Sequence, residues 1–277
     1  LFTLEFCPND DADEQILALG DQKAFFSWGC LANGIACMTK LGIVRLHNLT
    51  IGKHLSTLID SLCRCSVLEI LDLLNLKETD AEQIPAVNAS DRRFCECMHY
   101  TVQQKGQLKS SKIKPNICKL VQLTKNAMSE KSWLTLSNQL ETLSPSILHI
   151  DQVHQSSLVL HELFQGIGRC KNLTILSICC IHAGIDLVEF SGLKALHKLK
   201  KLTLCKITLP DSSWKELCEV IGKLTKLKEI SLAHLEMTSF IKVQKLSKLM
   251  LLEMREIELE ETLWTKLANK IISLPKL

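Results

Sequence analysis

Two cysteines and a histidine at alternate positions are the residues of this sequence that come nearest to a metal-binding group. They form the run Cys95-x-Cys97-x-His99. Zinc sites usually separate two cysteines by two to four residues and have a fourth ligand nearby, and this run does neither. It also overlaps a strand-like stretch, in which alternate residues share one face. We therefore interpret these side chains as strand residues.

Motifs for catalysis are missing from the sequence. His161-Glu162 begins like the metalloprotease motif H-E-x-x-H, but Gln165 stands where the second histidine would be. The glycine-rich patterns that hold phosphates and the nucleophile pattern G-x-S-x-G do not occur. We predict a protein that is not an enzyme, with no catalytic residues, no metal ligands and no cofactor-binding residues.

Positive charge is concentrated between Lys194 and Lys228. The other lysines of this stretch are Lys198, Lys200, Lys201, Lys206, Lys215, Lys223 and Lys226. They could bind an acidic partner, but a run of charge is more often the solvated rim of a fold, and we favour the rim. Because aromatic residues are not interleaved with the lysines, we expect no binding to nucleic acid.

The elements that must carry these residues follow an internal repeat. Residues 199–207 read L-x-x-L-x-L-x-x-I, and the same apolar frame recurs along the chain. Its copies begin at positions 41, 68, 117, 145, 173, 199, 227 and 249, which are 27, 49, 28, 28, 26, 28 and 22 residues apart. A period near 28 is typical of long leucine-rich repeats, in which a helix returns the chain to the next strand.

Amphipathic segments between the frames support this architecture. Trp214, Leu217, Cys218 and Ile221 have the spacing of one apolar helix face, and similar stripes lie at 55–62, 133–140, 160–167 and 263–271. Ser213 with Glu216 could form a capping box at one helix start. Since no strand–helix unit can bury its face alone, we predict an α/β leucine-rich-repeat solenoid. It would be a horseshoe like that of ribonuclease inhibitors, with a parallel inner sheet and outer helices.

The repeat also sets the domain organisation. We predict an irregular lead or cap over residues 1–40, which joins an absent upstream domain, and a repeat domain over 41–277. A degenerate repeat and a polar loop would occupy about 81–116. Because no polar capping repeat follows, we expect further C-terminal repeats beyond Leu277.

Composition limits the remaining classes. The net charge is +3, from 33 basic and 30 acidic residues, and no apolar run approaches the length of a membrane helix. We therefore expect no contact with a membrane. The 13 cysteines are scattered and odd in number, which favours reduced thiols and a cytoplasmic location.

The repeat geometry predicts the interaction surface. In L-x-x-L-x-L the leucines point into the core, and the residues between them stand on the exposed concave face of the sheet. The candidate protein-binding residues are His149, Asp151, Ser177, Lys201, Thr203, Glu229, Ser231, Glu253 and Arg255.

Four stretches carry a resemblance to a known family. Residues 1–6, 25–28, 61–68 and 166–176 resemble parts of the C-terminal leucine-rich-repeat region of NLR proteins. The first looks like the entry to the repeats, the second like the lead into the first strand, and the others like helix-to-strand joints. The similarity is greatest to the caspase-recruitment-domain members that assemble inflammasomes with NAIP sensors.

The resemblance implies a regulatory role in innate immunity. The repeats would hold their own upstream nucleotide-binding domain closed until a NAIP-type sensor arrives, after which protomers would assemble and recruit caspase-1. ATP or ADP would bind in that absent domain and not in these residues. Two alternatives stay open, which are a repeat domain that senses a ligand directly, as in NAIP-like receptors, and a general protein-binding scaffold.

Overall fold

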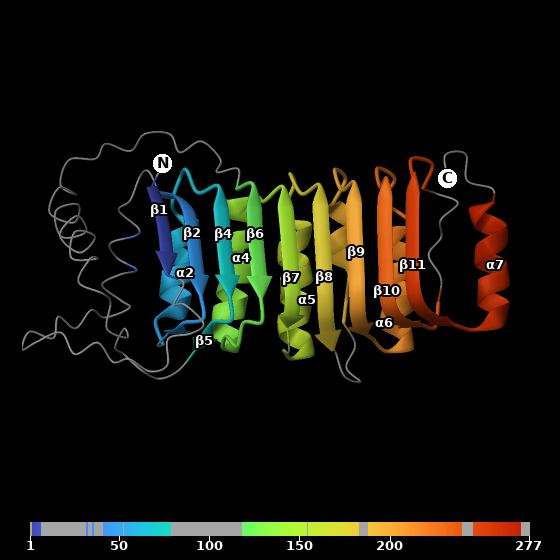
Figure 1. Ribbon diagram of the computed structural model, residues 1–277, viewed down its shortest axis with the longest axis horizontal. Coiled ribbons are helices and arrows are strands. Elements are labelled where there is room, and N and C mark those ends of the chain that lie inside the picture. The colour runs from blue at the N-terminus through green and yellow to red at the C-terminus, as the bar shows by residue number, and fades with distance from the viewer. Residues whose placement is uncertain are drawn as a thin grey trace, which may run out of the picture.

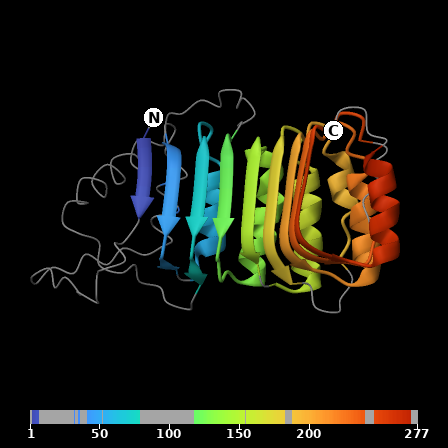
Figure 2. The same cartoon turned by 45° about the vertical axis from the view of Figure 1, so that its right-hand side comes forward.

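The strands of the chain form one continuous parallel sheet. The computed structural model describes residues 2–6, 32, 35, 41–51, 53–78, 118–153, 155–182, 188–239 and 246–272. Over these ranges nine strands pair in the order β1-β2-β4-β6-β7-β8-β9-β10-β11, and the helices lie on one side of the sheet (Figures 1 and 2). Strand order follows chain order, so each repeat adds one strand beside the last. The predicted α/β leucine-rich-repeat solenoid is confirmed.

Seven of the eight predicted frames coincide with strands of this sheet. The frame predicted to begin at 117 is wrong by one residue, because Cys118, Val121 and Leu123 are the buried residues of that repeat and Leu120 is only half-buried on the opposite face. The bounds of the strands are β1 Phe2–Phe6, β2 Leu41–His47, β4 Ile70–Leu74, β6 Leu120–Thr124, β7 Ile147–Val153, β8 Ile175–His182, β9 Lys201–Thr208, β10 Glu229–Met237 and β11 Leu251–Leu259. A second small sheet pairs β3 (Thr50–Ile51) with β5 (Lys77–Glu78). Ahead of the repeat domain, β1 pairs in parallel with β2 and so continues the sheet into the predicted lead.

The amphipathic segments form the helices. Their bounds are α2 Leu55–Cys63, α4 Glu130–Leu143, α5 Ser157–Gly168, α6 Asp211–Ile221 and α7 Glu261–Ile271. Two of them begin at serine caps, because the side chains of Ser129 and Ser156 accept the backbone N–H groups of Ser132 and Val159. Between β8 and β9 the returning element is a five-residue 3₁₀ helix, η3 (Ser191–Ala195). No helix of the described ranges has the length and apolar character to cross a membrane.

The core lies between the sheet and the helices. Each repeat contributes one buried residue to a row across the sheet, and this row is Val44, Leu71, Val121, Leu148, Leu176, Leu202 and Ile230. From the helix side the largest buried side chains are Trp133 and Trp214. Neighbouring repeats therefore share one core, as expected of a solenoid.

The predicted capping box at α6 is wrong. The helix begins at Asp211, so Ser213 and Glu216 lie inside its first turns. The Ser213 hydroxyl accepts the backbone N–H of Val188 at 3.0 Å, and the Glu216 carboxylate accepts that of Phe190 at 3.3 Å. Both side chains thus satisfy the backbone of the preceding connection, where amide groups would otherwise be left without partners.

A left-handed residue recurs at one position of every described repeat. Each lies directly after the same column of the sheet, with φ between 49° and 57°. The eight residues are Asn48, Asn75, Lys125, Gln152, Cys180, Lys206, His234 and Glu256. Asparagine tolerates this conformation, whereas lysine, glutamine, histidine and glutamate pay a steric cost for it. The turn geometry of the solenoid is therefore imposed by the stacking of neighbours and overrides local preference.

Close helix contacts depend on two glycines of α5 and one of η3. A Cβ atom on Gly166 would lie 2.3 Å from the carbonyl oxygen of Ser137 in α4. A Cβ atom on Gly168 would lie 2.2 Å from the carbonyl oxygen of Gly192 in η3. Backbone atoms occupy these positions, so a larger residue would force the helices apart.

Several predictions concern residues outside the described ranges. These are the degenerate repeat and loop at 81–116, the run Cys95-x-Cys97-x-His99, and most of the lead over 1–40. They stay predictions.

The left-handed position predicts a stabilising substitution. We expect Lys206→Gly to raise the free energy of unfolding by about 0.5–1 kcal/mol, because glycine adopts a positive φ without the Cβ clash. Thr208→Gly, two residues further along the same strand, should lower it by about the same amount. Urea denaturation of both variants measures the effect. Equal destabilisation by both would contradict the argument.

The close contact of Gly166 in α5 with Ser137 in α4 predicts a destabilising substitution. Gly166→Ala should lower the free energy of unfolding by about 2 kcal/mol or more, even though alanine favours a helix, because α4 and α5 must separate. Leu158→Ala on the exposed side of α5 is the control and should change stability by less than about 0.5 kcal/mol. A neutral Gly166→Ala variant in thermal or urea denaturation would show that the helices yield freely.

Candidate functional site

The nine predicted surface residues all lie on the open face of the sheet, which is the face away from the helices. They fall into three columns of the parallel register. His149, Ser177, Thr203, Ser231 and Glu253 form one column, Lys201 and Glu229 belong to a second, and Asp151 and Arg255 belong to a third. Buried core residues separate the columns, so the structure brings the nine together on one face, as the frame predicts.

The C-terminal part of this face holds a network of charged groups. Lys201 Nζ lies 3.0 Å from Glu229 Oε2 across β9 and β10. Ser231 donates to Glu253 Oε2 at 2.9 Å, and Arg255 pairs with the other carboxylate oxygen of Glu253. The Ser231 hydrogen bond and then the Arg255 guanidinium hold the pKa of Glu253 below its usual value. These groups are solvated, so their ion pairs contribute little to the stability of the fold.

Nearer the middle of the sheet the face is less polar. Partial burial lowers the pKa of His149, which keeps its imidazole neutral at physiological pH. At the N-terminal side, His47 Nε2 lies 2.9 Å from Asp72 Oδ2 across β2 and β4. This pair joins neighbouring strands one strand in from the N-terminal edge of the sheet, which is β1.

The structure reveals an aliphatic row that the choice of polar candidates missed. Five residues in register on neighbouring strands are half-buried on the open face, and they are Ile43, Ile70, Leu120, Ile147 and Ile175. We call these five the aliphatic row. With strands about 4.8 Å apart, the row extends about 19 Å across the sheet. The row ends at Lys201 and Glu229, which occupy the same column on β9 and β10.

A repeated position in the sequence carries this row. In each of these five repeats the residue just before the second core residue of the frame is isoleucine or leucine. Solvent-facing positions of a sheet are usually polar, so five aliphatic residues in one column form an unusual apolar strip on the open face. Such a strip is typical of a binding surface.

Three cysteines lie at the centre of the open face. Cys179 on β8 and Cys205 on β9 are direct partners in the register, and Cys180 follows at the left-handed position. Burial raises the pKa of Cys179 to about 11, with a smaller contribution from Cys205, while a hydrogen bond from Ser177 opposes the rise. All three are free thiols, as are the buried Cys63, Cys65, Cys118, Cys170 and Cys218.

No three His, Cys, Asp or Glu side chains of the described residues converge on a point where a metal ion could bind. His161 of α5 lies 3.8 Å from Glu189 and has no second histidine beside it.

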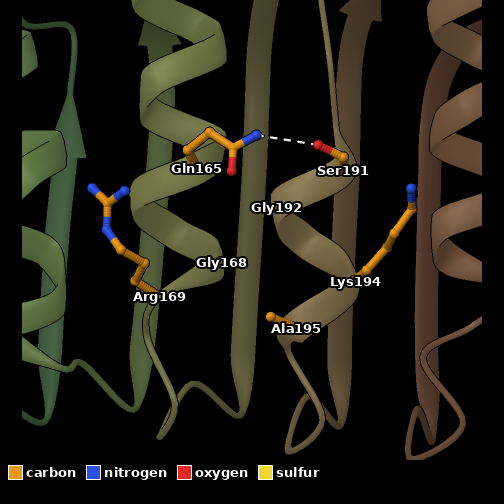
Figure 3. Close-up of a pocket in the computed structure, with 7 residues that line it drawn as sticks. All are labelled: Gln165, Gly168, Arg169, Ser191, Gly192, Lys194 and Ala195. Carbon is orange, nitrogen blue, oxygen red and sulfur yellow. Dashed lines mark hydrogen bonds between the residues drawn. The ribbon is translucent and has the colours of Figure 1, made fainter.

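A second candidate feature is a shallow hollow on the helix side. It has a volume of about 410 Å³ and lies between α5 and η3. Gly168 of α5 and Gly192 of η3 are close to each other in its lining, with Arg169 to one side and Lys194 to the other (Figure 3). Gln165 donates to Ser191 at 3.2 Å across the upper edge. The hollow exists because η3 is shorter than the helices on either side of it.

Comparison with known proteins assigns the chain to no family. No protein-family model matches the sequence, and no curated protein matches it. Among solved structures, internalin C2 of Listeria monocytogenes is 14% identical, with a TM-score of 0.43 and 90% of each chain covered.

Two other solved structures are longer than this chain. A leucine-rich-repeat protein of Leptospira interrogans is 18% identical, with a TM-score of 0.34, and the match covers 87% of this chain and 61% of that one. TLR13, solved in complex with ssRNA13, is 17% identical, with a TM-score of 0.34, and the match covers 82% and 38%. The assignment of the fold rests on the register of the strands themselves.

The raised pKa of Cys179 predicts slow alkylation. At pH 7.5 we expect iodoacetamide to modify Cys179 about a hundredfold more slowly in the folded chain than in urea, because the thiolate is the nucleophile. The folded-state rate should rise about tenfold per pH unit up to about pH 11. Mass spectrometry of the peptide that contains Cys179 measures both rates. A plateau near pH 9 would show an ordinary thiol.

Proposed function

We propose that the chain is a protein-binding leucine-rich-repeat domain that regulates a cytoplasmic NLR-type receptor and has no enzymatic activity of its own. In this role its open face binds the upstream nucleotide-binding domain and keeps that domain closed and monomeric. A NAIP-type sensor then displaces the repeats, and the freed protomers assemble and activate caspase-1. Any ATP or ADP binds to the upstream domain.

The observation that carries the binding role is the aliphatic row. Five half-buried aliphatic side chains in register make an apolar strip about 19 Å long. Complete burial of one such side chain under a partner contributes about 1 kcal/mol. The row therefore supplies a few kcal/mol of binding free energy. This is enough to make the closed state about a hundredfold or more as populated as the open state.

The polar groups beside the row fit a protein partner. Lys201 with Glu229, and Glu253 with Arg255, place charges of both signs where the row ends. A partner that covers the row must match these charges, which fixes its position along the sheet. An apolar centre with a polar margin is the usual composition of a protein interface.

The receptor class is supported by the resemblance in sequence. Residues 61–68 and 166–176 carry part of it, and they form the joints from α2 into β4 and from α5 into β8. Restraint by repeats requires a domain that binds its own chain in one state and releases it in another. An interface worth a few kcal/mol meets this requirement, because a sensor can outcompete it.

The test uses the longer receptor chain that this proposal implies. Ile70→Glu combined with Ile147→Glu places two carboxylates on the aliphatic row and should weaken the closed state by more than about a hundredfold. Spontaneous oligomerisation and caspase-1 cleavage without a bacterial stimulus are the expected results. Leu158→Glu combined with Asn269→Glu is the control, since it adds the same charge on exposed parts of α5 and α7.

The other outcomes separate the alternatives. If the row variant is silent even with stimulus while the control responds, the row recognises a ligand and the domain acts as a direct sensor. If both variants behave like the wild type, the open face does not restrain the receptor, and a general scaffold is the better description. Thermal unfolding of both variants establishes that the fold is retained.

A further inference from the structure

Four successive turns, each just before one of the strands β8 to β11, share one geometry. In each turn the backbone N–H of the fourth residue donates to the carbonyl of the first, at 3.0, 3.1, 3.0 and 2.9 Å. The four turns are Cys170–Leu173, Leu196–Leu199, Leu224–Leu227 and Leu246–Leu249. They stack along one edge of the solenoid, because Lys200 N donates to Thr174 O, Lys228 N to Lys200 O, and Met250 N to Lys228 O, each at 2.8 Å.

This stacking gathers lysines that are far apart in the sequence. The third residue of the last three turns is Lys198, Lys226 or Lys248, and the first turn has Asn172 in its place. Lys198 Nζ donates to Asn172 Oδ1 at 2.9 Å, so side chains of neighbouring turns reach one another. Lys200 and Lys228 occupy the residue just after the turn in two of the repeats. We call these five residues, all of them exposed, the lysine edge.

Acidic groups do not compensate this charge within the described part of the chain. The carboxylate nearest in the register, Glu229, is paired with Lys201. No ion pair joins any residue of the lysine edge to a described Asp or Glu. Since successive turns are about 4.8 Å apart, the ammonium groups repel one another unless an external anion lies between them.

Two further features extend the lysine edge. At its start, the hollow between α5 and η3 carries Lys194 on one side and directly precedes the second turn. At its end, Met250 is 60% exposed and Leu251 is 50% exposed, next to Lys228. A ligand that follows the edge therefore meets cations along its length and an apolar contact at one end.

We infer that the lysine edge is a docking site for an acidic segment of a partner protein, bound in an extended form across the stacked turns. Carboxylates of the segment lie between the ammonium groups of Lys198, Lys226 and Lys248. An aliphatic side chain of the segment covers Met250. The five lysines of this surface lie outside the aliphatic row, because they belong to the turns before the strands. Only Leu251 at its end shares the column of the row, through its pairing with Glu229.

The chemistry of the edge favours a peptide over other anions. Alternate side chains of an extended peptide are about 6.7 Å apart, and flexible lysines can adjust a spacing of about 4.8 Å to meet them. Nucleic acid would have no aromatic side chain on which to stack here, and it gains nothing from Met250 and Leu251. A membrane surface would need a broad basic face, whereas these lysines lie along one narrow edge.

The test measures binding of a fluorescein-labelled peptide made of repeated Glu-Glu-Leu to the chain by fluorescence anisotropy. The uncharged peptide made of repeated Gln-Gln-Leu is the matched probe. The variant Lys198→Glu/Lys226→Glu/Lys248→Glu should weaken binding of the acidic peptide at least about tenfold. The control Lys125→Glu/Lys131→Glu/Lys215→Glu has the same net charge, changes exposed lysines elsewhere, and should alter the affinity less than about twofold.

Other results would overturn the inference. Equal weakening by the two triple variants would mean that only net charge matters. Tighter binding of oligouridine or of phosphatidylserine vesicles than of the acidic peptide, lost in the lysine-edge variant, would mean that the edge serves RNA or a membrane. Equal binding of the Glu-Glu-Leu and Gln-Gln-Leu peptides would exclude an electrostatic site. The variant Ile70→Glu/Ile147→Glu should bind the acidic peptide like the wild type, which separates this inference from the proposed restraint.

Discussion

The hydrogen bonding of each strand and turn to the equivalent position of the next repeat is the constraint on which this structure depends. The sheet is parallel throughout its described strands, and the joints continue the same ladder beyond the strands. A residue type that recurs at one frame position must therefore form a row in space. Leucines at the inward positions make the core, aliphatic residues at one outward position make the aliphatic row, and lysines at the turns make the lysine edge.

This constraint is strong enough to override local preferences. Lys206, His234 and Glu256 adopt a left-handed conformation that such residues normally avoid, at the position where Asn48 and Asn75 adopt it readily. The hydrogen bonds between repeats and the packing of the core rows on either side of the turn offset this steric cost. In the same way Ser213 and Glu216 leave their own helix start without a side-chain cap and satisfy the backbone of the preceding repeat.

The sequence allowed seven of the eight frames, the helices and the open face to be predicted, because all three follow from apolar periodicity, which is local. The frame at 117 was one residue out, because Leu120 has an aliphatic side chain but lies in an outward column. The sequence could not show properties that depend on contacts with the adjacent repeat. The left-handed positions have no common residue type, and the capping interpretation failed because the partners of Ser213 and Glu216 come from another repeat. The 3₁₀ helix at Ser191–Ala195 lies in a segment without an apolar stripe.

The polar columns of the candidate site were predicted from the sequence, but the aliphatic row was not. The frame predicts that residues between the leucines stand on the exposed face of the sheet, and the polar candidates do lie together on the open face. The aliphatic row was overlooked, although Ile43, Ile70 and Ile147 occupy the same frame position. In a single repeat such a residue looks like part of the core. Only alignment of the repeats shows that it belongs to an outward column.

The two surfaces differ in the physics of what they can bind. The aliphatic row gains its free energy from burial of apolar area, which salt hardly changes, so it suits a contact that must persist until a competitor arrives. The lysine edge acts through solvated charges, which are screened over about 8 Å at physiological ionic strength and mainly accelerate encounter. Because the row lies on the open face and the edge lies along the turns, one partner can occupy the row while another approaches the edge. Under the two proposals, the solenoid separates a restraining contact on the aliphatic row from a docking contact on the lysine edge.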